Sequence, residues 1–277
     1  MIAFHVDKEK CIGCGLCAAD CPMGIIAMEE GLPVIPAADE ARCIHCLHCF
    51  AICDPGAIAI DGHTATAQDA QHENLPSPEQ MESLVRGRRA IRNYLKENLE
   101  PGLIDRMLAV AWHAPTGRNE RRLLFTVVDD RQVLDRIREE ALHGLSALVE
   151  QRKLPHGMEI FADIVEAWQV QKIDILFRGA PHLLVVSAPR NGISPLPDAV
   201  IALTTFELFA RSLGVGTVWN GLAKIAIDDL VPSLRALIGI PEDHLIGYAM
   251  CFGRPAVRYA RHAPRHPQAI NRVKIAG

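Results

Sequence analysis

Eight of the chain's nine cysteines lie within residues 11–53, in two blocks that share one spacing. This spacing is the C-x2-C-x2-C-x3-C pattern of bacterial iron–sulfur proteins, in which three thiolates bind one 4Fe–4S cluster and the fourth binds the other cluster. A shift of 32 positions superposes the blocks and matches 9 of 18 residues, so the internal repeat predicts two equivalent sites. The candidate ligands are Cys11, Cys14, Cys17 and Cys21 in the first block and Cys43, Cys46, Cys49 and Cys53 in the second.

Other uses of clustered cysteines fit this pattern less well. Structural zinc sites use cysteine pairs separated by a dozen or more residues, which leaves the triplets unexplained. A disulfide framework requires an oxidising compartment, whereas the first residues lack the features of a signal peptide, so we expect a cytoplasmic protein. The C-x-x-C-H signature of c-type haem does not occur. His45 and His48 lie between cysteines, and we interpret them as groups outside the ligand set because the block already holds four thiols.

The first sixty residues resemble the two-cluster ferredoxins of bacteria. The resemblance implies that the fourth ligands are exchanged between the blocks. One departure is Cys53-Asp54-Pro55, where the proline stands one place later than in Cys21-Pro22; we expect it to alter the local turn without removing a ligand. The implied ligand sets are Cys11, Cys14, Cys17 and Cys53 for one cluster and Cys43, Cys46, Cys49 and Cys21 for the other.

Composition and charge divide the chain into two parts. A polar stretch without periodicity, residues 62–76, follows the cysteine-rich part and indicates a linker. Residues 1–70 carry a charge of −7 and the other 207 residues +3, so the first part suits a basic redox partner. The mildly acidic total of −4 and the short charge-free stretches give no reason to expect a nucleic acid or a membrane as a partner. The predicted domains are 1–62 and 78–277, joined by a linker over 63–77.

The second part alternates between helical and strand patterns, which predicts a mixed α+β fold. Ser77-Pro78-Glu79-Gln80 combines an N-cap, a proline at the first helical position and a glutamine three residues after the cap, so a helix should begin there. Helices are expected over about 79–87, 102–113, 130–150, 198–213 and 228–238, and strands over Leu123–Val128, His182–Ser187, Val215–Trp219 and Leu245–Phe252.

Four arginines occur within seven residues in Arg86-Gly87-Arg88-Arg89-Ala90-Ile91-Arg92. Guanidinium groups bind phosphate through paired hydrogen bonds, so this segment is a candidate phosphate site; a solvated basic face is the alternative. The sequence contains neither G-x-G-x-x-G nor G-x-x-x-x-G-K, so the Rossmann and P-loop nucleotide motifs are absent.

Four segments in order resemble the FMN-dependent nitroreductase family over roughly residues 79–265. They are the arginine segment, Ala114-Pro115-Thr116-Gly117-Arg118-Asn119, Leu213–Gly221, and the strand ending at Gly253-Arg254-Pro255 with its basic tail. The resemblance implies a nitroreductase-like α/β FMN domain after the ferredoxin-like domain, and a homodimer with shared flavin sites. It further implies that Arg88, Arg89 and Arg92 hold the FMN phosphate, that Pro115, Thr116 and Asn119 contact the flavin ring or ribityl chain, that Asn220 and Gly221 offer backbone groups near N5, and that Arg258 and Arg261 form a second phosphate contact.

Two departures from the family pattern concern the site. Ala90 stands where the family often has serine, so a hydroxyl contact to phosphate is lost. Glu120-Arg121-Arg122 and Leu123 replace the expected x-Q-P-W stretch, which predicts a different wall on the substrate side.

The cofactors implied are FMN and two 4Fe–4S clusters. We therefore expect an FMN-dependent oxidoreductase that passes electrons between the clusters and FMN and reduces an organic acceptor of the nitroaromatic, quinone or enone type. The electron donor would be a ferredoxin-like protein or NAD(P)H. No residue is assigned as a catalytic acid, because water or the flavin can supply protons. The alternatives are a non-enzymatic electron carrier and a flavin enzyme of the same family that dehalogenates aromatics or breaks down flavin.

Overall fold

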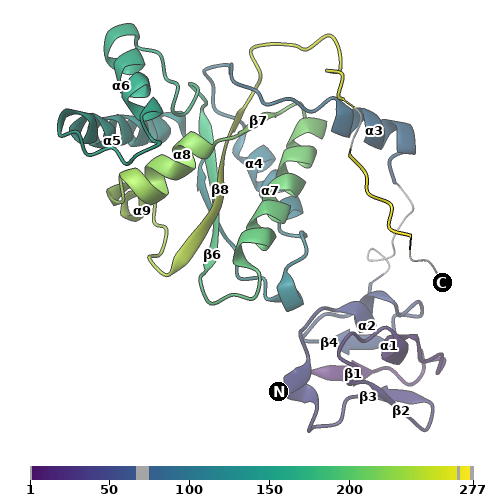
Figure 1. The fold of residues 1–277 in the computed structure, drawn as a ribbon. Helices are drawn as coiled ribbons and strands as arrows, with labels where there is room; N and C mark the ends of the chain where they lie inside the picture. The colour runs from purple at the N-terminus through teal and green to yellow at the C-terminus, as the bar shows by residue number, and fades with distance from the viewer. Residues whose placement is uncertain (1, 67–74, 267–268, 275–277) are drawn as a thin grey trace. The chain divides into compact units, whose positions relative to one another are not determined.

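The chain forms two compact units. The computed structural model describes residues 2–66, 75–266 and 269–274. One unit comprises Met1–Leu75 with Thr116–Arg121, and the other comprises Pro76–Pro115 with Arg122–Gly277; Figure 1 shows their elements. Residues 67–74 of the predicted linker lie outside the described part, and the predicted domain limits stay a prediction. Among the described helices, none has the length and apolar character needed to cross a membrane.

The first unit contains two short antiparallel strand pairs and two single-turn helices. Its small core consists of isoleucines that pack with two of the cysteines, so the thiols and the core are built from the same loops. The helices α1 (Leu16–Ala19) and α2 (His48–Ala51) occupy equivalent positions of the sequence repeat. β1 (Phe4–Val6) pairs with β4 (Ile58–Ile60), β2 (Ala27–Glu29) pairs with β3 (Leu32–Val34), and a 3-10 turn spans Glu40–Arg42.

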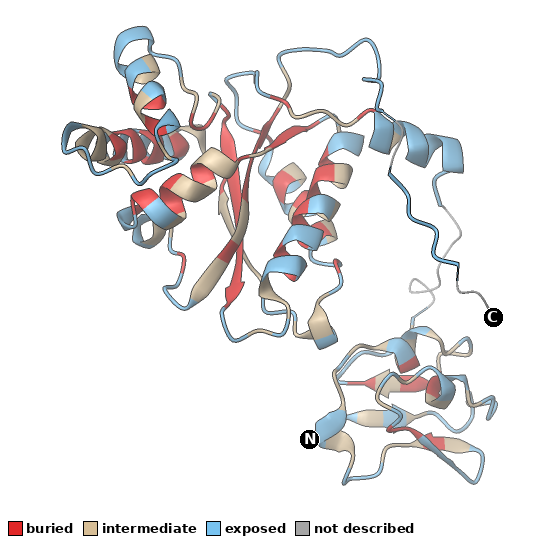
Figure 2. Ribbon diagram, viewed as in Figure 1, coloured by how far each residue is buried: buried red, intermediate tan, exposed pale blue. Residues whose placement is uncertain are grey.

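The second unit centres on an antiparallel sheet with the strand order β5-β6-β8-β7. Every residue of β6 is buried, because helices cover both faces of the sheet (Figure 2). Leu184 and Val186 belong to one core, and Leu183 and Val185 to the other, as the alternation of side chains along a strand requires. The strands are β5 (Leu124–Val128), β6 (His182–Pro189), β7 (Gly216–Trp219) and β8 (His244–Gly253).

The helices of this unit divide between the two faces of the sheet. α4 (Pro101–Ala111) and α7 (Pro195–Ser212) contribute to one core. The other core contains side chains of α5 (Arg131–Glu150), α6 (Ile160–Gln171), α8 (Gly221–Ile225), a π-helical turn (Ala226–Leu230) and α9 (Ser233–Leu237).

The predicted helix start at Ser77 is confirmed. α3 (Pro78–Arg86) begins with a capping box, in which the backbone N–H of Gln80 donates to Ser77 Oγ (3.2 Å) and the N–H of Ser77 donates to Gln80 Oε1 (2.9 Å). These bonds satisfy backbone donors that have no partner inside the helix.

The α+β fold class is also confirmed, and all four expected strands are present. The single helix expected over 228–238 is wrong, because Pro232 has no N–H to continue a helix and separates the π-helical turn from α9. α6 was not expected. Its buried residues Phe161, Ile164 and Val165 follow helical spacing, which is the signal that would have indicated it.

Candidate functional site

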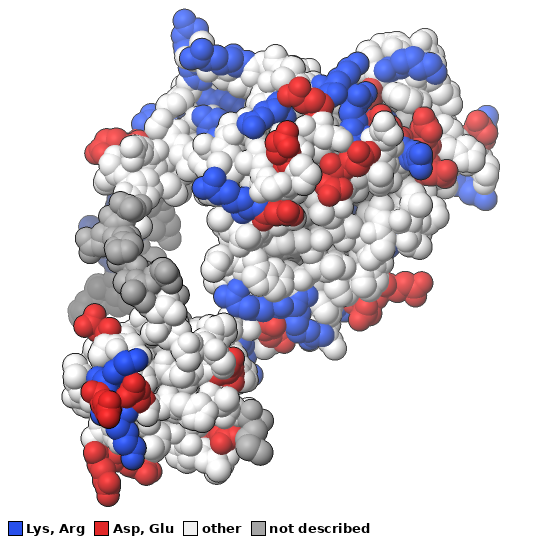
Figure 3. Space-filling view, turned by 180° about the vertical axis from the view of Figure 1, so that it is seen from behind, with Lys and Arg blue, Asp and Glu red and all other residues white. Residues whose placement is uncertain are grey.

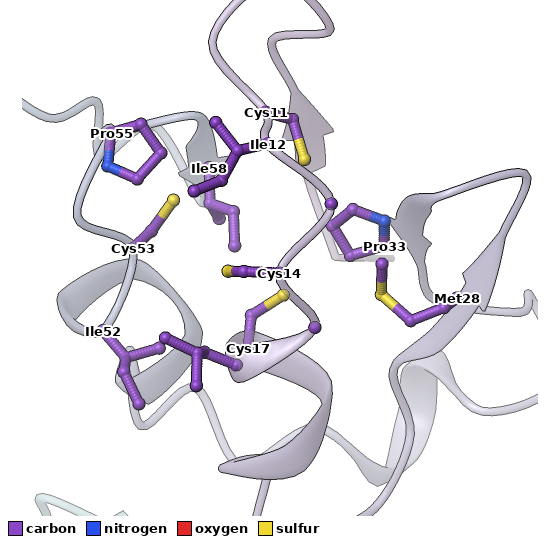
Figure 4. A pocket seen from close by; sticks show the side chains of 13 residues that line it. Cys11, Ile12, Cys14, Cys17, Met28, Pro33, Ile52, Cys53, Pro55 and Ile58 are labelled. Atoms are coloured by element: carbon purple, nitrogen blue, oxygen red, sulfur yellow. The ribbon is translucent and has the colours of Figure 1, made fainter.

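Thiols from both cysteine blocks line one cavity of the first unit (Figure 4). Three of them come from the loop before α1 and from α1 itself, and Cys53 comes from the turn after α2. The folded chain thus brings together residues that are 36 or more positions apart in the sequence. The four thiols are Cys11, Cys14, Cys17 and Cys53, and the other side chains around them are mainly apolar: Ile12, Leu16, Met28, Pro33, Ile52, Pro55 and Ile58.

A second cavity repeats this arrangement with the blocks exchanged. Cys21, which follows α1, lies with the three thiols around the start of α2, and Ile25, Ile26 and Ile60 line the same cavity. The four thiols are Cys21, Cys43, Cys46 and Cys49. The two sets are the ones that the ferredoxin resemblance implies, and the ligand role of each thiol stays a prediction.

The thiols surround a volume rather than converge on a point. Within the part of the chain that the structure describes, no three His, Cys, Asp or Glu side chains lie close enough together to hold a metal ion. A 4Fe–4S cluster differs from a single ion because each thiolate binds a different iron at a corner of the cube. Thiols spread around an enclosed, apolar cavity therefore fit a cluster.

The loops that carry the thiols need backbone conformations that favour glycine. Gly13 and Gly15 have φ of 66° and 72°, and the repeat places His45 and Leu47, with φ of 50° and 59°, at the equivalent positions. Non-glycine residues are uncommon in this left-handed region because the side chain crowds the backbone. The second loop therefore keeps the geometry of the first at a cost in strain.

The displaced proline after Cys53 does not change the turn. The N–H of Gly24 donates to the carbonyl of Cys21 (2.9 Å), and the N–H of Gly56 donates to that of Cys53 at the same distance. Both glycines have positive φ. The expectation of an altered turn at Cys53 is therefore wrong, because the glycine and not the proline shapes it.

Burial and backbone dipoles set the electrostatics of the thiols. Burial raises the pKa of Cys17 and Cys43, and it raises the pKa of Cys49 to about 11. These thiolates therefore require a nearby positive charge such as iron. The N–H of His45 points to the sulfur of Cys43 (3.4 Å), and the N–H of Ala57 points to that of Cys53 (3.2 Å); such bonds tune cluster potentials.

The predicted phosphate-binding arginines lie in the second unit, on the segment that follows α3. Ile91 donates its N–H to the carbonyl of Thr217 on β7 (2.8 Å), which fixes this segment beside the sheet. Arg88 Nη1 donates to the buried carboxylate of Glu207 on α7 (3.1 Å). Arg89 Nη1 donates to the carbonyl of Arg88 (2.6 Å), whereas its Nη2 is buried and has no hydrogen-bond partner within the part of the chain that the structure describes.

Two further arginine features bear on the phosphate site. Arg92 is exposed, and its Nη1 donates to the carbonyl of Ala90 (3.4 Å). Arg211 on α7 was not predicted as a site residue. Burial, followed by the charges of Arg89 and Arg88, lowers the pKa of Arg211. No spacing rule could have indicated it, because more than 115 positions separate it from the other two arginines.

The groups predicted near flavin N5 lie where β7 meets α8, with Asn220 as the N-cap of α8 and Gly221 as its first residue. Asn220 is buried; its Oδ1 accepts the N–H of Ala223 (2.9 Å), and its Nδ2 donates to the carbonyl of Leu176 (2.8 Å) and to the sulfur of Cys251 (3.1 Å). Its backbone N–H donates to the carbonyl of Ala249 (2.8 Å). Asn220 thus holds the end of β7 in place.

The remaining predicted site residues are spread over the chain. Pro115 belongs to the second unit, whereas Thr116 and Asn119 belong to the first. There, Asn119 Nδ2 donates to the carbonyl of Ile44 (3.1 Å) and to that of His45 (2.9 Å). Arg258 and Arg261 are exposed on the chain after β8. The flavin contacts assigned to these residues stay predictions.

Comparison with known proteins identifies the class of both parts. Residues 85–254 match the nitroreductase family, and residues 10–58 match the 4Fe-4S dicluster domain. The chain therefore belongs to the nitroreductase family and begins with a dicluster domain. The predicted family, fold class and enzyme class are confirmed, and the predicted cofactors agree with both matches.

Individual relatives are more distant. A Methanothermobacter thermautotrophicus protein with the provisional name NADH dehydrogenase/NAD(P)H nitroreductase is 29% identical over 178 residues, covering 62% of this chain and 75% of the relative. The 4-nitrobenzoate reductase of Nocardioides sp. is 26% identical, and the match covers 65% of this chain and 82% of the relative. The iodotyrosine deiodinase of Danio rerio is 24% identical, and the match covers 66% of this chain and 63% of the relative. The crystal structure of a Bacteroides fragilis nitroreductase with bound FMN shares the fold, with a TM-score of 0.59 and 19% identity. The superposition covers 70% of this chain and 99% of that structure.

Proposed function

We propose that this protein is an iron–sulfur flavoprotein oxidoreductase that passes electrons between two 4Fe–4S clusters and FMN and reduces an organic acceptor. The observation that carries the proposal is the combination, in one chain, of a dicluster domain with two exchanged thiol sets and a nitroreductase domain with an arginine cluster. FMN couples single-electron transfer to two-electron reduction, which is the chemistry that such a combination requires.

The residues of the second unit fit the phosphate of FMN. Over residues 2–66, 75–266 and 269–274, which the structure describes, the buried Nη2 of Arg89 has no hydrogen-bond partner, and a phosphate oxygen would satisfy it. Arg88, Arg89 and Arg92 would hold the phosphate, and Arg258 and Arg261 would supply its second contact. Pro115, Thr116 and Asn119 would contact the flavin ring or ribityl chain, and the backbone at Asn220 and Gly221 would lie near N5.

The acceptor belongs to the nitroaromatic, quinone or enone class. The relative named 4-nitrobenzoate reductase supports the nitroaromatic member of this class. Arg121 and Arg122 stand where the family pattern has uncharged glutamine and proline, and the two added positive charges favour an acceptor with a carboxylate. The donor is a ferredoxin-like protein or NAD(P)H.

The flavin site would be completed in a homodimer. α3, α4 and α7 enclose an apolar groove, and Met81, Val200 and Ile201 expose about 40% of their surface there. An apolar patch of this kind on a soluble domain marks an interaction site. We assign a second copy of the chain to this groove because the nitroreductase resemblance implies a homodimer with shared flavin sites.

The composition of the anaerobically purified protein tests the proposal. Two clusters and one flavin require about eight iron, eight sulfide and one FMN per chain. Stopped-flow reduction by NADH then separates the donors: flavin that bleaches before the cluster band means that electrons enter at FMN. A protein that holds clusters, lacks flavin and is indifferent to substitution of Arg88 and Arg89 would instead be an electron carrier.

A dehalogenase is the second candidate, since an iodotyrosine deiodinase is among the relatives. Turnover of a nitrobenzoate and of a halogenated tyrosine by the same reduced protein distinguishes the two chemistries.

A further inference from the structure

A buried carboxylate on α7 pairs with one guanidinium group of the second unit, and a second guanidinium group follows it on the same helix. Arg88 pairs with Glu207 at 3.1 Å, and Glu207 also accepts hydrogen bonds from Trp219 Nε1 (3.0 Å) and Thr217 Oγ1 (3.3 Å). Glu207 is thereby fully engaged by β7 and Arg88. Arg211 lies one helical turn after Glu207 on α7 and is held by a bond from its Nε to the carbonyl of Leu84 (3.1 Å).

Gly87 leaves room for the guanidinium of Arg211 at the end of α3. A Cβ atom at this position would lie 2.3 Å from Arg211 Nη2 and 2.8 Å from the carbonyl oxygen of Ser83. The φ of Gly87 is −78°, which every residue adopts. Lack of room for a side chain, and not the backbone conformation, therefore explains why residue 87 is glycine. The guanidinium of Arg211 occupies this room and so lies beside the segment that carries Arg88 and Arg89.

We propose that Arg211 is a further phosphate-binding residue, which completes with Arg88 and Arg89 a three-arginine site for the phosphate of FMN. The inference rests on the proposed flavin function and extends its phosphate site to α7. Among the described residues, the buried Nη2 of Arg89 has no hydrogen-bond partner, so it is a donor that a phosphate oxygen would satisfy.

The net charge of the three arginines and Glu207 matches the charge of a phosphate monoester. Three guanidinium groups and the Glu207 carboxylate leave two positive charges, and a phosphate monoester carries about −1.5 to −2 at neutral pH. Arg88 and Arg89 are half-buried, so salt screens the repulsion between them less than it screens repulsion between fully exposed charges. A dianion removes this repulsion, so the site favours FMN over riboflavin, which has the same ring and no phosphate.

Matched substitutions measure this preference. Arg211→Gln removes the charge, Arg211→Lys keeps the charge without the planar fork, and Arg136→Gln removes an exposed charge on α5, outside the predicted phosphate segment. Fluorescence quenching gives the dissociation constants of FMN and riboflavin for each full-length variant. We expect Arg211→Gln to weaken FMN binding at least tenfold, Arg211→Lys to recover part of the loss, and Arg136→Gln to have no effect. Riboflavin affinity should be equal in all four proteins.

The outcomes separate this inference from the flavin proposal. If the wild type binds FMN and Arg211→Gln binds it equally well, Arg211 has no part in the site while the flavin function stands. If the wild type binds no FMN, the flavin function fails; the anion site then survives only if inorganic phosphate raises the melting temperature of the wild type and not that of Arg211→Gln. Should Arg211→Gln fail to fold, Gly87→Ala provides the second variant, and unchanged FMN affinity in it overturns the inference.

Discussion

At the scale of single residues, the exchange of the fourth thiol decides how the two clusters depend on one another. Cys53 lies with the first block and Cys21 with the second. Gly24 and Gly56 form the same turn after these two cysteines, although the neighbouring prolines differ in position. A substituted cysteine should therefore affect the cluster whose cavity its side chain lines, even where the other thiols of that cavity belong to the other block.

Double substitutions test this exchange. Cys14→Ser should leave about four iron per chain, because it removes one cluster of two. Adding Cys53→Ser should cause no further loss, since both thiols line the same cavity. Adding Cys21→Ser to Cys14→Ser should instead remove nearly all iron. Iron and sulfide analysis after anaerobic reconstitution measures these contents, and a loss that follows the sequence blocks would contradict the exchange.

At the scale of elements, β6 anchors the segment that precedes α4. His182 is fully buried on β6, and its Nε2 accepts the backbone N–H of Leu99 (2.9 Å). The Nε2 lone pair, which would bind a proton, thus already accepts a hydrogen bond. Burial lowers the pKa of His182 from its ordinary value, so the folded protein holds a neutral imidazole.

This bond predicts a pH dependence of stability. Below the ordinary histidine pKa of about 6.5 the unfolded chain binds a proton that folded His182 resists, so the free energy of unfolding should fall as the pH drops below that value, by up to about 1.4 kcal/mol per pH unit. His182→Gln should lose this contribution, whereas His143→Gln on the exposed surface of α5 should keep it. Urea unfolding at pH 5–8, followed by the fluorescence of the three tryptophans of the second unit, measures the slopes. Equal slopes in His182→Gln and the wild type would contradict the explanation.

At the scale of the whole molecule, the second unit carries mixed surface charges and an apolar groove, and these two features have different consequences for association. Lys and Arg side chains are interspersed with acidic ones over the second unit (Figure 3), which limits non-specific association. The groove lined by α3, α4 and α7 is apolar, and the proposed dimer depends on it.

A charged group in this groove should separate the proposed dimer. Ile201 on α7 is 39% exposed, and Ile201→Glu would place a carboxylate in the interface, where its desolvation is unfavourable. We expect a monomer with weakened flavin binding. Val170→Glu, at a more exposed position on α6, is the control and should remain dimeric. Light scattering after size-exclusion chromatography gives the masses, and a dimeric Ile201→Glu protein would rule out this groove as the interface.

The sequence by itself determined the features that depend on neighbouring residues. The cysteine spacing indicated two cluster sites, the capping box at Ser77 marked the start of α3, and the strand periodicities predicted the sheet, because each of these is a local relation along the chain. Tertiary structure decided which distant groups meet. It brought Cys53 to the first block, and it placed Arg211 and Glu207 of α7 beside Arg88 and Arg89. The ferredoxin resemblance already implied the place of Cys53 from the cysteine pattern. No spacing along the chain encodes the arginine contacts, because they arise from the packing of both cores around the sheet.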